Sequence, residues 1–472
     1  MKFTFENLKF CHRASLVGCC LLALLVVGCK GIPTDAERHA RDDIRAVRAE
    51  YRPDGHRPEL PVLTADAGLS NHLVYAVLNE PSIEAAYYDW AASVERITTA
   101  RSFPDPRLTF QSDIMDTITS LMPGLMFDLP GPGKRHAAAA VASAESSGKY
   151  FQFQSRILQT TFNLKQAYYR LHLLDAKVRV NRDTLALLIE LEKVARTQNE
   201  TGKGTLQDVL RAQIEQARRE TEIENLEDSR ALLMAQFKAS MGLRPENPDP
   251  PVPTQFETTS LDLTSQTLLT NAMARNPRLR AMEAEVRQAE ATMSVARKAR
   301  LPDWSVGVEA DVKSSPTLYR PQVSVNLPVW RDKLAAQLAE AQAGKKSAQA
   351  RLSAEEIALA VDYADKSFSY RENSRALSLV SERLLPKARM ALEVSRSAYL
   401  SGQTDFLNVI DAQRMLLEFE LMEVEARVER EIAIAEISLI IVGNSSGQKE
   451  KLASRWRSPD GGAQARMPML RE

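Results

Sequence analysis

The chain has 472 residues, 26% of them charged, and its 61 Lys and Arg residues balance its 61 Asp and Glu residues. A net charge of zero argues against a nucleic-acid-binding protein, because such proteins present a basic face to the phosphates. Beyond the N-terminus no apolar stretch is long enough for a spanning helix, so any later membrane span has to be made of β-strands.

Residues 1–28 have the features of a signal peptide: a basic start, then a mostly apolar stretch at 16–27 that is too short to span a membrane. The stretch ends in Val-Val-Gly before Cys29, which resembles the bacterial lipobox and implies a covalent lipid on the Cys29 thiol. By resemblance to sorting in Gram-negative bacteria, Lys30 favours the outer membrane. The alternative is an ordinary signal peptide with an incidental cysteine.

The remainder of the chain divides into five parts by composition. Residues 29–66 are polar, and we expect an extended lead-in that follows the lipidated cysteine. Two similar segments, 67–242 and 263–443, are joined by a proline-rich linker at 243–262. The polar tail at 444–472 is expected to be disordered.

The two similar segments carry the same landmarks about 200 positions apart, which indicates an internal duplication. Such a repeat favours a pseudo-symmetric, elongated architecture over an enzyme with a single pocket. The matched pairs are Pro104-Asp105 with Pro302-Asp303, Leu129-Pro130 with Leu327-Pro328, Thr201-Gly202 with Ser401-Gly402, and Gly242 with Gly443.

Each repeat is predicted to run helix, β-hairpin, long helix, helix. Residues 149–201 and 205–241 contain neither Gly nor Pro, and apolar residues recur in them at coiled-coil spacing. A helix of ~65 residues would be about 100 Å long. In the second repeat Pro386 is expected to kink or interrupt the long helix, whereas its counterpart in the first repeat is Ala186.

Two hairpins, at about 106–130 and 304–328, alternate apolar and polar residues. Their strands have the length that crosses a tilted bilayer barrel, about 9–11 residues. Trp304 and Trp330 flank the base of the second hairpin, where an aromatic girdle would lie. A soluble half-buried sheet would alternate in the same way, but the polar face here is charged, as a water-filled lumen prefers. Four strands cannot close a barrel, so a spanning chain has to oligomerise.

The duplicated unit, the lipobox and the two glycine turns resemble the TolC-type outer-membrane efflux protein family over about 67–443. Residues 399–413 look like the family's tyrosine-glycine turn at the periplasmic tip, and residues 129–135 look like the strand-to-helix junction of the heavy-metal, CzcC-like branch. The resemblance implies a mainly α fold with a small β part. A homotrimer would form a twelve-stranded transmembrane β-barrel in outer-membrane lipid and a periplasmic α-barrel, docked on a periplasmic adaptor and an inner-membrane pump.

Several residues near the two turns are candidate functional residues by their match to the family's pattern. Gly202 and Gly402 are expected to be left-handed helix C-caps whose exposed backbone an adaptor can contact. Asp208 and Asp411 match acidic residues that line the tip aperture, and Tyr399 matches the tip tyrosine.

Each of these residues also has a purely structural interpretation. The two acids are equally compatible with helix capping, since Thr205 and Asp208 have capping-box spacing, and Tyr399 with packing between helices. The family's basic gate partner is replaced by Thr404 and another acid by Asn408, so any latch has to differ in detail.

No catalytic motif occurs, and the histidines at 39, 56, 72, 136 and 172 show no paired spacing. We therefore expect no enzyme activity, no metal site and no cofactor apart from the lipid on Cys29.

The predicted function is a passive outer-membrane exit duct of a tripartite efflux or type I export system. The alternatives are a lipid-anchored periplasmic coiled-coil scaffold without a pore and an envelope enzyme with a helical spacer. The sequence does not identify the cargo, and the junction motif at residues 129–135 weakly favours divalent metal ions.

Overall fold

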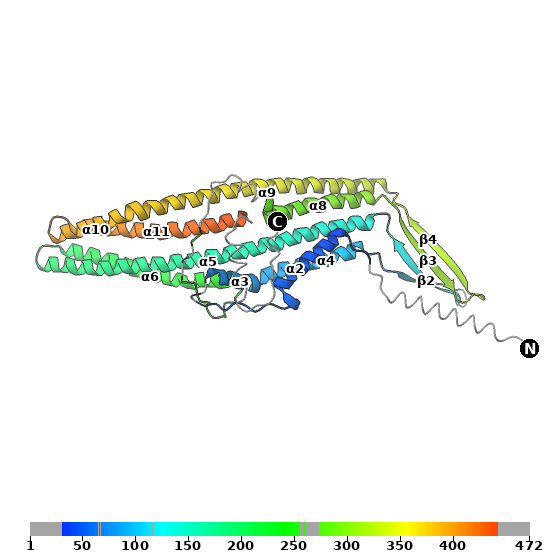
Figure 1. Cartoon of the computed structure of the whole chain (residues 1–472), viewed down its shortest axis with the longest axis horizontal. Coiled ribbons are helices and arrows are strands. Elements are labelled where there is room, and N and C mark those ends of the chain that lie inside the picture. Colours follow the sequence, from blue (N-terminus) through cyan, green and yellow to red (C-terminus); the bar gives the residue numbers. More distant parts are fainter. Residues whose placement is uncertain are drawn as a thin grey trace, which may run out of the picture.

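The structure is a computed structural model that describes residues 31–64, 66, 68–114, 118–254, 256, 258–259 and 273–441. Cys29, the signal segment and the tail at 444–472 lie outside the described residues. Figure 1 shows a long rod of helices with a narrow sheet at one end and two helical turns at the other. The expectation of a mainly helical chain with a small β part is confirmed.

In the first repeat one further helix precedes the predicted order of helix, hairpin, long helix and helix. The elements are α3 (Leu69–Asn79), α4 (Pro81–Arg101), β1 (Arg107–Ile114), β2 (Ile118–Leu129), α5 (Lys134–Glu200) and α6 (Leu206–Ser240). Helix α5 has 67 residues, which corresponds to about 100 Å. This single helix runs from the base of the sheet to the far end of the rod (Figure 1).

The second repeat has the same order but a broken long helix. The elements are α8 (Pro277–Lys298), β3 (Asp303–Asp311), β4 (Leu318–Asn326), α9 (Arg331–Leu379), the π-turn η2 (Val380–Leu384), α10 (Leu385–Leu400) and α11 (Phe406–Ile440). Pro386 has no amide hydrogen and its ring would clash with the carbonyl four residues back. The wider turn accommodates it, with the Leu385 amide donating to the Val380 carbonyl. The predicted interruption is confirmed, and α5 is unbroken at Ala186.

The expectation of an extended lead-in is wrong for much of its length. Residues Asp35–Tyr51 form helix α2, followed by the short 3-10 turn η1 (Pro53–Gly55). The Thr34 hydroxyl accepts a hydrogen bond from the Glu37 amide and caps the helix. Acidic residues in the first turn stabilise the helix further, because they interact favourably with the positive end of its dipole. Val47 and Tyr51 are buried against α4 and α5. This packing stabilises a helix that the polar composition of the segment did not predict.

The four strands form one antiparallel sheet in the order β1-β2-β3-β4, so the two hairpins lie next to each other. The register places apolar residues of all four strands on one face: Leu108 opposite Leu125, Leu125 opposite Val308, and Val308 opposite Pro321. This face is bare, since Phe110 and Val323 are both 67% exposed. The opposite face is polar, and Glu309 on it is only 3% exposed. The predicted alternation is therefore present in the sheet, with Met122 and Met126 of β2 as apolar exceptions on the polar face.

The helices lie side by side rather than around one central core. Near the sheet the order is α4, α5, α8, α9, and toward the turns it is α6, α5, α11, α10. The outermost helices, α4 with α9 and α6 with α10, do not pack extensively against each other within the described residues. The helices thus form a row with two open edges, one made by the first repeat and one by the second.

The described part of the linker (243–254, 256 and 258–259) contains no helix or strand and is held at the waist of the rod. The buried Lys238 ammonium donates to the carbonyls of Pro245 and Asn247 at 2.9 and 2.5 Å. Two imidazoles hydrogen-bond to later carbonyls, His72 to Pro251 and His172 to Pro253.

Candidate functional site

The two helical turns at the end of the rod farthest from the sheet end their preceding helices in the same way. Gly202 and Gly402 have φ angles of 73° and 72°, in the left-handed region that glycine adopts without a steric penalty. In each turn an amide after the glycine donates back to the helix: Lys203 to Gln198 at 2.8 Å, and Gln403 to Ala398 at 2.9 Å. This is the expected helix C-cap, and space is open around both glycines.

The carboxylate of Asp208 caps the helix that follows the first turn. Its oxygen accepts from the Thr205 amide at 3.1 Å, while the Thr205 hydroxyl accepts from the Asp208 amide at 3.3 Å. In the second turn Asp405 occupies the equivalent capping position without a side-chain cap bond, and Asn408 donates instead to the Thr404 hydroxyl. The capping interpretation of Asp208 thus accounts for its position, and a role in a gate stays a prediction.

We call the end of the rod that contains the two turns the tip. Tyr399 lies inside the tip rather than on its surface, with only 6% of its area exposed. Its ring packs against Phe406 from α11, with centroids 5.2 Å apart. Its buried hydroxyl has no hydrogen-bond partner among the described residues. Burial raises the pKa of this hydroxyl, and the negative charge of Asp208 raises it further. The geometry favours the packing interpretation, and Tyr399 as a moving gate residue stays a prediction.

One apolar cluster joins both turns into a single tip. It contains Leu188, Leu191, Ala195, Val209, Ala212, Leu392, Tyr399, Phe406, Val409, Ile410 and Ala412, from α5, α6, α10 and α11. The two helical hairpins therefore do not separate without exposing apolar surface, which costs free energy in water.

An ion-pair network next to this cluster was missed by the sequence analysis. The Arg414 guanidinium of α11 donates to the Glu215 carboxylate of α6 at 2.5 Å, and Glu215 is buried. Arg218 bonds the same carboxylate at 2.9 Å from within α6. Asp411 lies 3.7 Å from Arg414 on its own helix. Hydrogen bonding to Glu215 raises the pKa of Arg414 despite partial burial.

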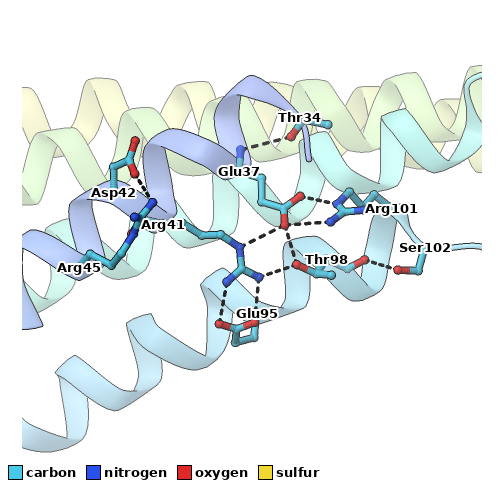
Figure 2. Close-up of polar contacts among 9 residues, drawn as sticks. All are labelled: Thr34, Glu37, Arg41, Asp42, Arg45, Glu95, Thr98, Arg101 and Ser102. Carbon is cyan, nitrogen blue, oxygen red and sulfur yellow. Dashed lines mark hydrogen bonds and ion pairs between the residues drawn. The ribbon is translucent and has the colours of Figure 1, made fainter. Parts of the chain in front are cut away.

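A second missed cluster fixes helix α2 to the end of α4 nearest the sheet. Figure 2 shows the Glu37 carboxylate surrounded by Arg101, Arg41 and Thr98. The Thr98 hydroxyl donates to it at 2.6 Å and Arg41 at 3.2 Å, and Arg41 also bonds Glu95 at 2.9 Å. Burial alone would raise the pKa of Glu37, but the hydrogen bonds from Arg101, Thr98 and Arg41 outweigh it and lower the pKa to about 2.

Both tryptophans proposed for an aromatic girdle lie at the sheet base. Trp304 on β3 is 44% exposed and sits opposite Leu129 and Val325 on the apolar face. Trp330, directly before α9, is 75% exposed. Among the described residues, no helix combines the length and the hydropathy of a membrane span. The same part of the chain brings no three His, Cys, Asp or Glu residues together as metal ligands.

The chain shares its fold with solved outer-membrane channels. It aligns with the outer-membrane channel OprN at a TM-score of 0.71 and 18% identity, covering 80% of this chain and 90% of OprN. The open-state MtrE channel of Neisseria gonorrhoeae aligns at a TM-score of 0.68 and 16% identity, covering 82% and 96%. In sequence, the cobalt-zinc-cadmium resistance protein CzcC of Cupriavidus metallidurans is 22% identical over 377 residues, covering 75% of this chain and 84% of CzcC.

The fold is thus that of an outer-membrane channel subunit. Residues 268–441 match the family model described as outer membrane efflux protein. This match confirms the resemblance to the family that the tip turns and the repeat predicted. Its place is the outer membrane.

Proposed function

We propose that this protein is the passive outer-membrane exit duct of a tripartite efflux or type I export system. The observation that carries the proposal is a row of helices and strands with two unlike edges and one exposed apolar sheet face. Strands β1 and β4 are the free edges of the sheet, and unpaired strand edges are not tolerated in lipid.

The edges indicate how copies would assemble. The first repeat forms one edge through β1, α4 and α6, and the second forms the other through β4, α9 and α10. Two unlike edges make a heterologous, head-to-tail contact, which forms a ring when the rotation between successive copies closes. In a homotrimer β4 of one copy pairs with β1 of the next, giving twelve strands whose apolar face meets lipid and whose polar face lines the lumen.

Exposed apolar residues on the outermost tip helices fit the same assembly. Leu206, Leu210 and Ile214 lie at four-residue spacing on α6, and Met390 and Val394 lie at the same spacing on α10. A ring of three copies would bring these two stripes together and continue the helices as a hollow α-barrel.

At the tip the duct would dock on a periplasmic adaptor and, through it, on an inner-membrane pump that supplies the energy. The turns at Gly202 and Gly402 would provide the contact. Asp208 and Asp411 would each occur three times around the aperture, and such acidic rings attract cations. Opening would be a population shift, in which the adaptor binds the open tip better than the closed one.

The lipid on Cys29 and the identity of the cargo belong to the same proposal. A single acylated terminus binds a membrane only moderately, so the lipid would supplement the barrel. The name of the related CzcC refers to cobalt, zinc and cadmium, and by that likeness divalent metal ions are the proposed cargo, passing through the lumen without a dedicated binding site.

Single-particle imaging of the full chain in detergent tests the proposal. A hollow three-fold cylinder capped by a narrow barrel is the expected result. A solid rod or a monomer would contradict it and would favour a lipid-anchored scaffold without a pore.

A further inference from the structure

The junction between the helices and the sheet carries an exposed cluster of basic side chains. Helix α8 ends at Lys298 shortly before β3, and α9 begins at Arg331 shortly after β4. Asp303 and Asn326 are paired across these strands, so the two connecting segments lie side by side at the base of the sheet (Figure 1). We call the cluster the basic collar; it consists of Arg297, Arg300, Arg331 and Lys333.

The charges of the basic collar are not neutralised within the chain. All four side chains are exposed, and no carboxylate among the described residues forms an ion pair with them. Two neighbouring lysines, in contrast, have partners within the chain. Lys134 bonds Asp303 at 2.8 Å, and Lys298 donates to the Gly133 carbonyl at 3.1 Å. Asp332 is the only acid in the segments 297–301 and 329–333, so the surface keeps a positive balance.

Bare apolar side chains lie directly beside the collar. Leu327 and Val329 are 63% and 64% exposed, and Trp330 is three-quarters exposed. They continue from the apolar face of the sheet toward the cations. Tryptophan next to Lys and Arg, at the edge of an apolar band, is the arrangement found where a protein crosses a membrane–water interface.

We propose that the basic collar binds the phosphates of anionic phospholipids in the membrane leaflet that faces the rod. The proposal rests on the exit-duct function, because it requires the sheet to span the outer membrane. Acyl chains would lie against the apolar residues while the phosphates meet the guanidinium groups, whose planar donors bind phosphate oxygens in pairs. Held in this way at the end of the rod, the sheet cannot slide deeper into the bilayer.

The test compares the full-length wild-type protein with a collar variant, R297Q/R300Q/R331Q/K333Q. Glutamine keeps a long polar side chain and removes only the charge. A matched control, R371Q/R375Q/R383Q/K387Q, removes three arginines and one lysine that are likewise exposed and without an ion-pair partner among the described residues, but lie along α9, η2 and α10. Circular dichroism is used to check that all three proteins have the same helix content.

Each protein is equilibrated in mixed micelles of phosphatidylglycerol and phosphatidylcholine, and the retained lipid is measured after purification. A basic residue near an anionic surface changes the binding equilibrium by a factor of about five. We expect the wild type and the control to retain phosphatidylglycerol in preference to phosphatidylcholine. In the collar variant this preference should be at least about tenfold smaller. Raising the salt concentration should weaken the preference of the wild type, because exposed charges are screened.

The proposal is overturned if the wild type shows no preference, or if the collar variant keeps it. It is also overturned if inorganic phosphate abolishes the preference where sodium chloride of equal ionic strength does not, because the site would then bind free phosphate. Insertion into vesicles is measured on the same samples. A wild type that does not insert contradicts the exit duct itself, whereas insertion without lipid preference contradicts the collar alone.

Discussion

Arg414 on α11 reaches the buried Glu215 on α6 at 2.5 Å, and this ion pair connects the two helical hairpins at the tip. Glu215 also bonds Arg218, but that contact stays within α6. One carboxylate thus receives two guanidinium groups, of which only one bridges the repeats. The effect of breaking the bridge between the repeats can therefore be separated from the effect of removing one positive charge next to Glu215.

Arg414→Gln should loosen the tip, and Arg218→Gln should not. The substitution removes the bridge between hairpins, and a double-mutant cycle with Glu215→Gln should give a coupling free energy of about 1 kcal/mol for Arg414. In planar bilayers the Arg414 variant is expected to show a higher leak conductance than the Arg218 variant. Equal conductance in the two variants would mean that the bridge does not hold the tip.

The capping and gating roles of Asp208 can be separated by size-matched substitution. Asp208→Ala removes the acceptor for the Thr205 amide and should destabilise the start of α6 by about 1 kcal/mol. Asp208→Asn keeps an acceptor oxygen and should be nearly as stable as the wild type. If the acids form a gate, Asp208→Asn with Asp411→Asn raises the leak conductance without a loss of stability. An unchanged conductance removes both residues from the gate.

The Glu37 cluster should make the docking of α2 sensitive to acid. Because the pKa of Glu37 is lowered to about 2 from an ordinary value of 4.5, its contribution is fully present above pH 4.5 and is lost as the pH falls toward 2. Glu37→Gln should weaken docking at neutral pH by about 3 kcal/mol, since it leaves the largely buried Arg101 guanidinium without its negative counter-charge.

Hydrogen exchange of α2 measures this effect. The difference between the wild type and Glu37→Gln should shrink steadily between pH 5 and pH 2. A difference that is independent of pH would show that the ionised carboxylate is not what holds the helix.

Glycines at helix ends should differ in their tolerance of alanine. Gly402→Ala places a side chain in open space, so only the left-handed backbone costs free energy, about 1–2 kcal/mol. Gly242 has a similar φ of 68°, but a Cβ there would lie 2.7 Å from the Glu80 backbone. Gly242→Ala should therefore lower the thermal unfolding midpoint clearly more than Gly402→Ala. The same shift for both would argue against the close contact at the waist.

The sequence predicted the features that the two repeats share and the interruption at Pro386, and it missed helix α2 and the ion pairs between distant helices. Landmarks shared by both halves located the strands, the turns and the long helices, and Pro386 marked the one helix that differs. Arg414 and Glu215 lie in different repeats, 199 positions apart. Comparing equivalent positions of the two repeats does not reveal this contact, because it depends on how the two helical hairpins pack together.

Helix α2 differs from the predicted extended chain because about half of its residues are charged, and such a polar composition is also typical of an extended segment. A local signal was present: Thr34 and Glu37 have the spacing of a capping box, which predicts a helix start. The burial of Glu37 could not be predicted, since it depends on Arg101 and Thr98 from a distant helix.

The π-turn at Val380–Leu384 gives the two halves of the chain unequal mechanics. In the first repeat one unbroken helix carries any load from the tip to the membrane, like a stiff strut. In the second repeat the long helix bends more easily at one point, because the π-turn replaces the regular α-helical hydrogen bonds there. A pull or twist applied at the two turns would bend the α10–α11 arm while the α5–α6 arm stays straight.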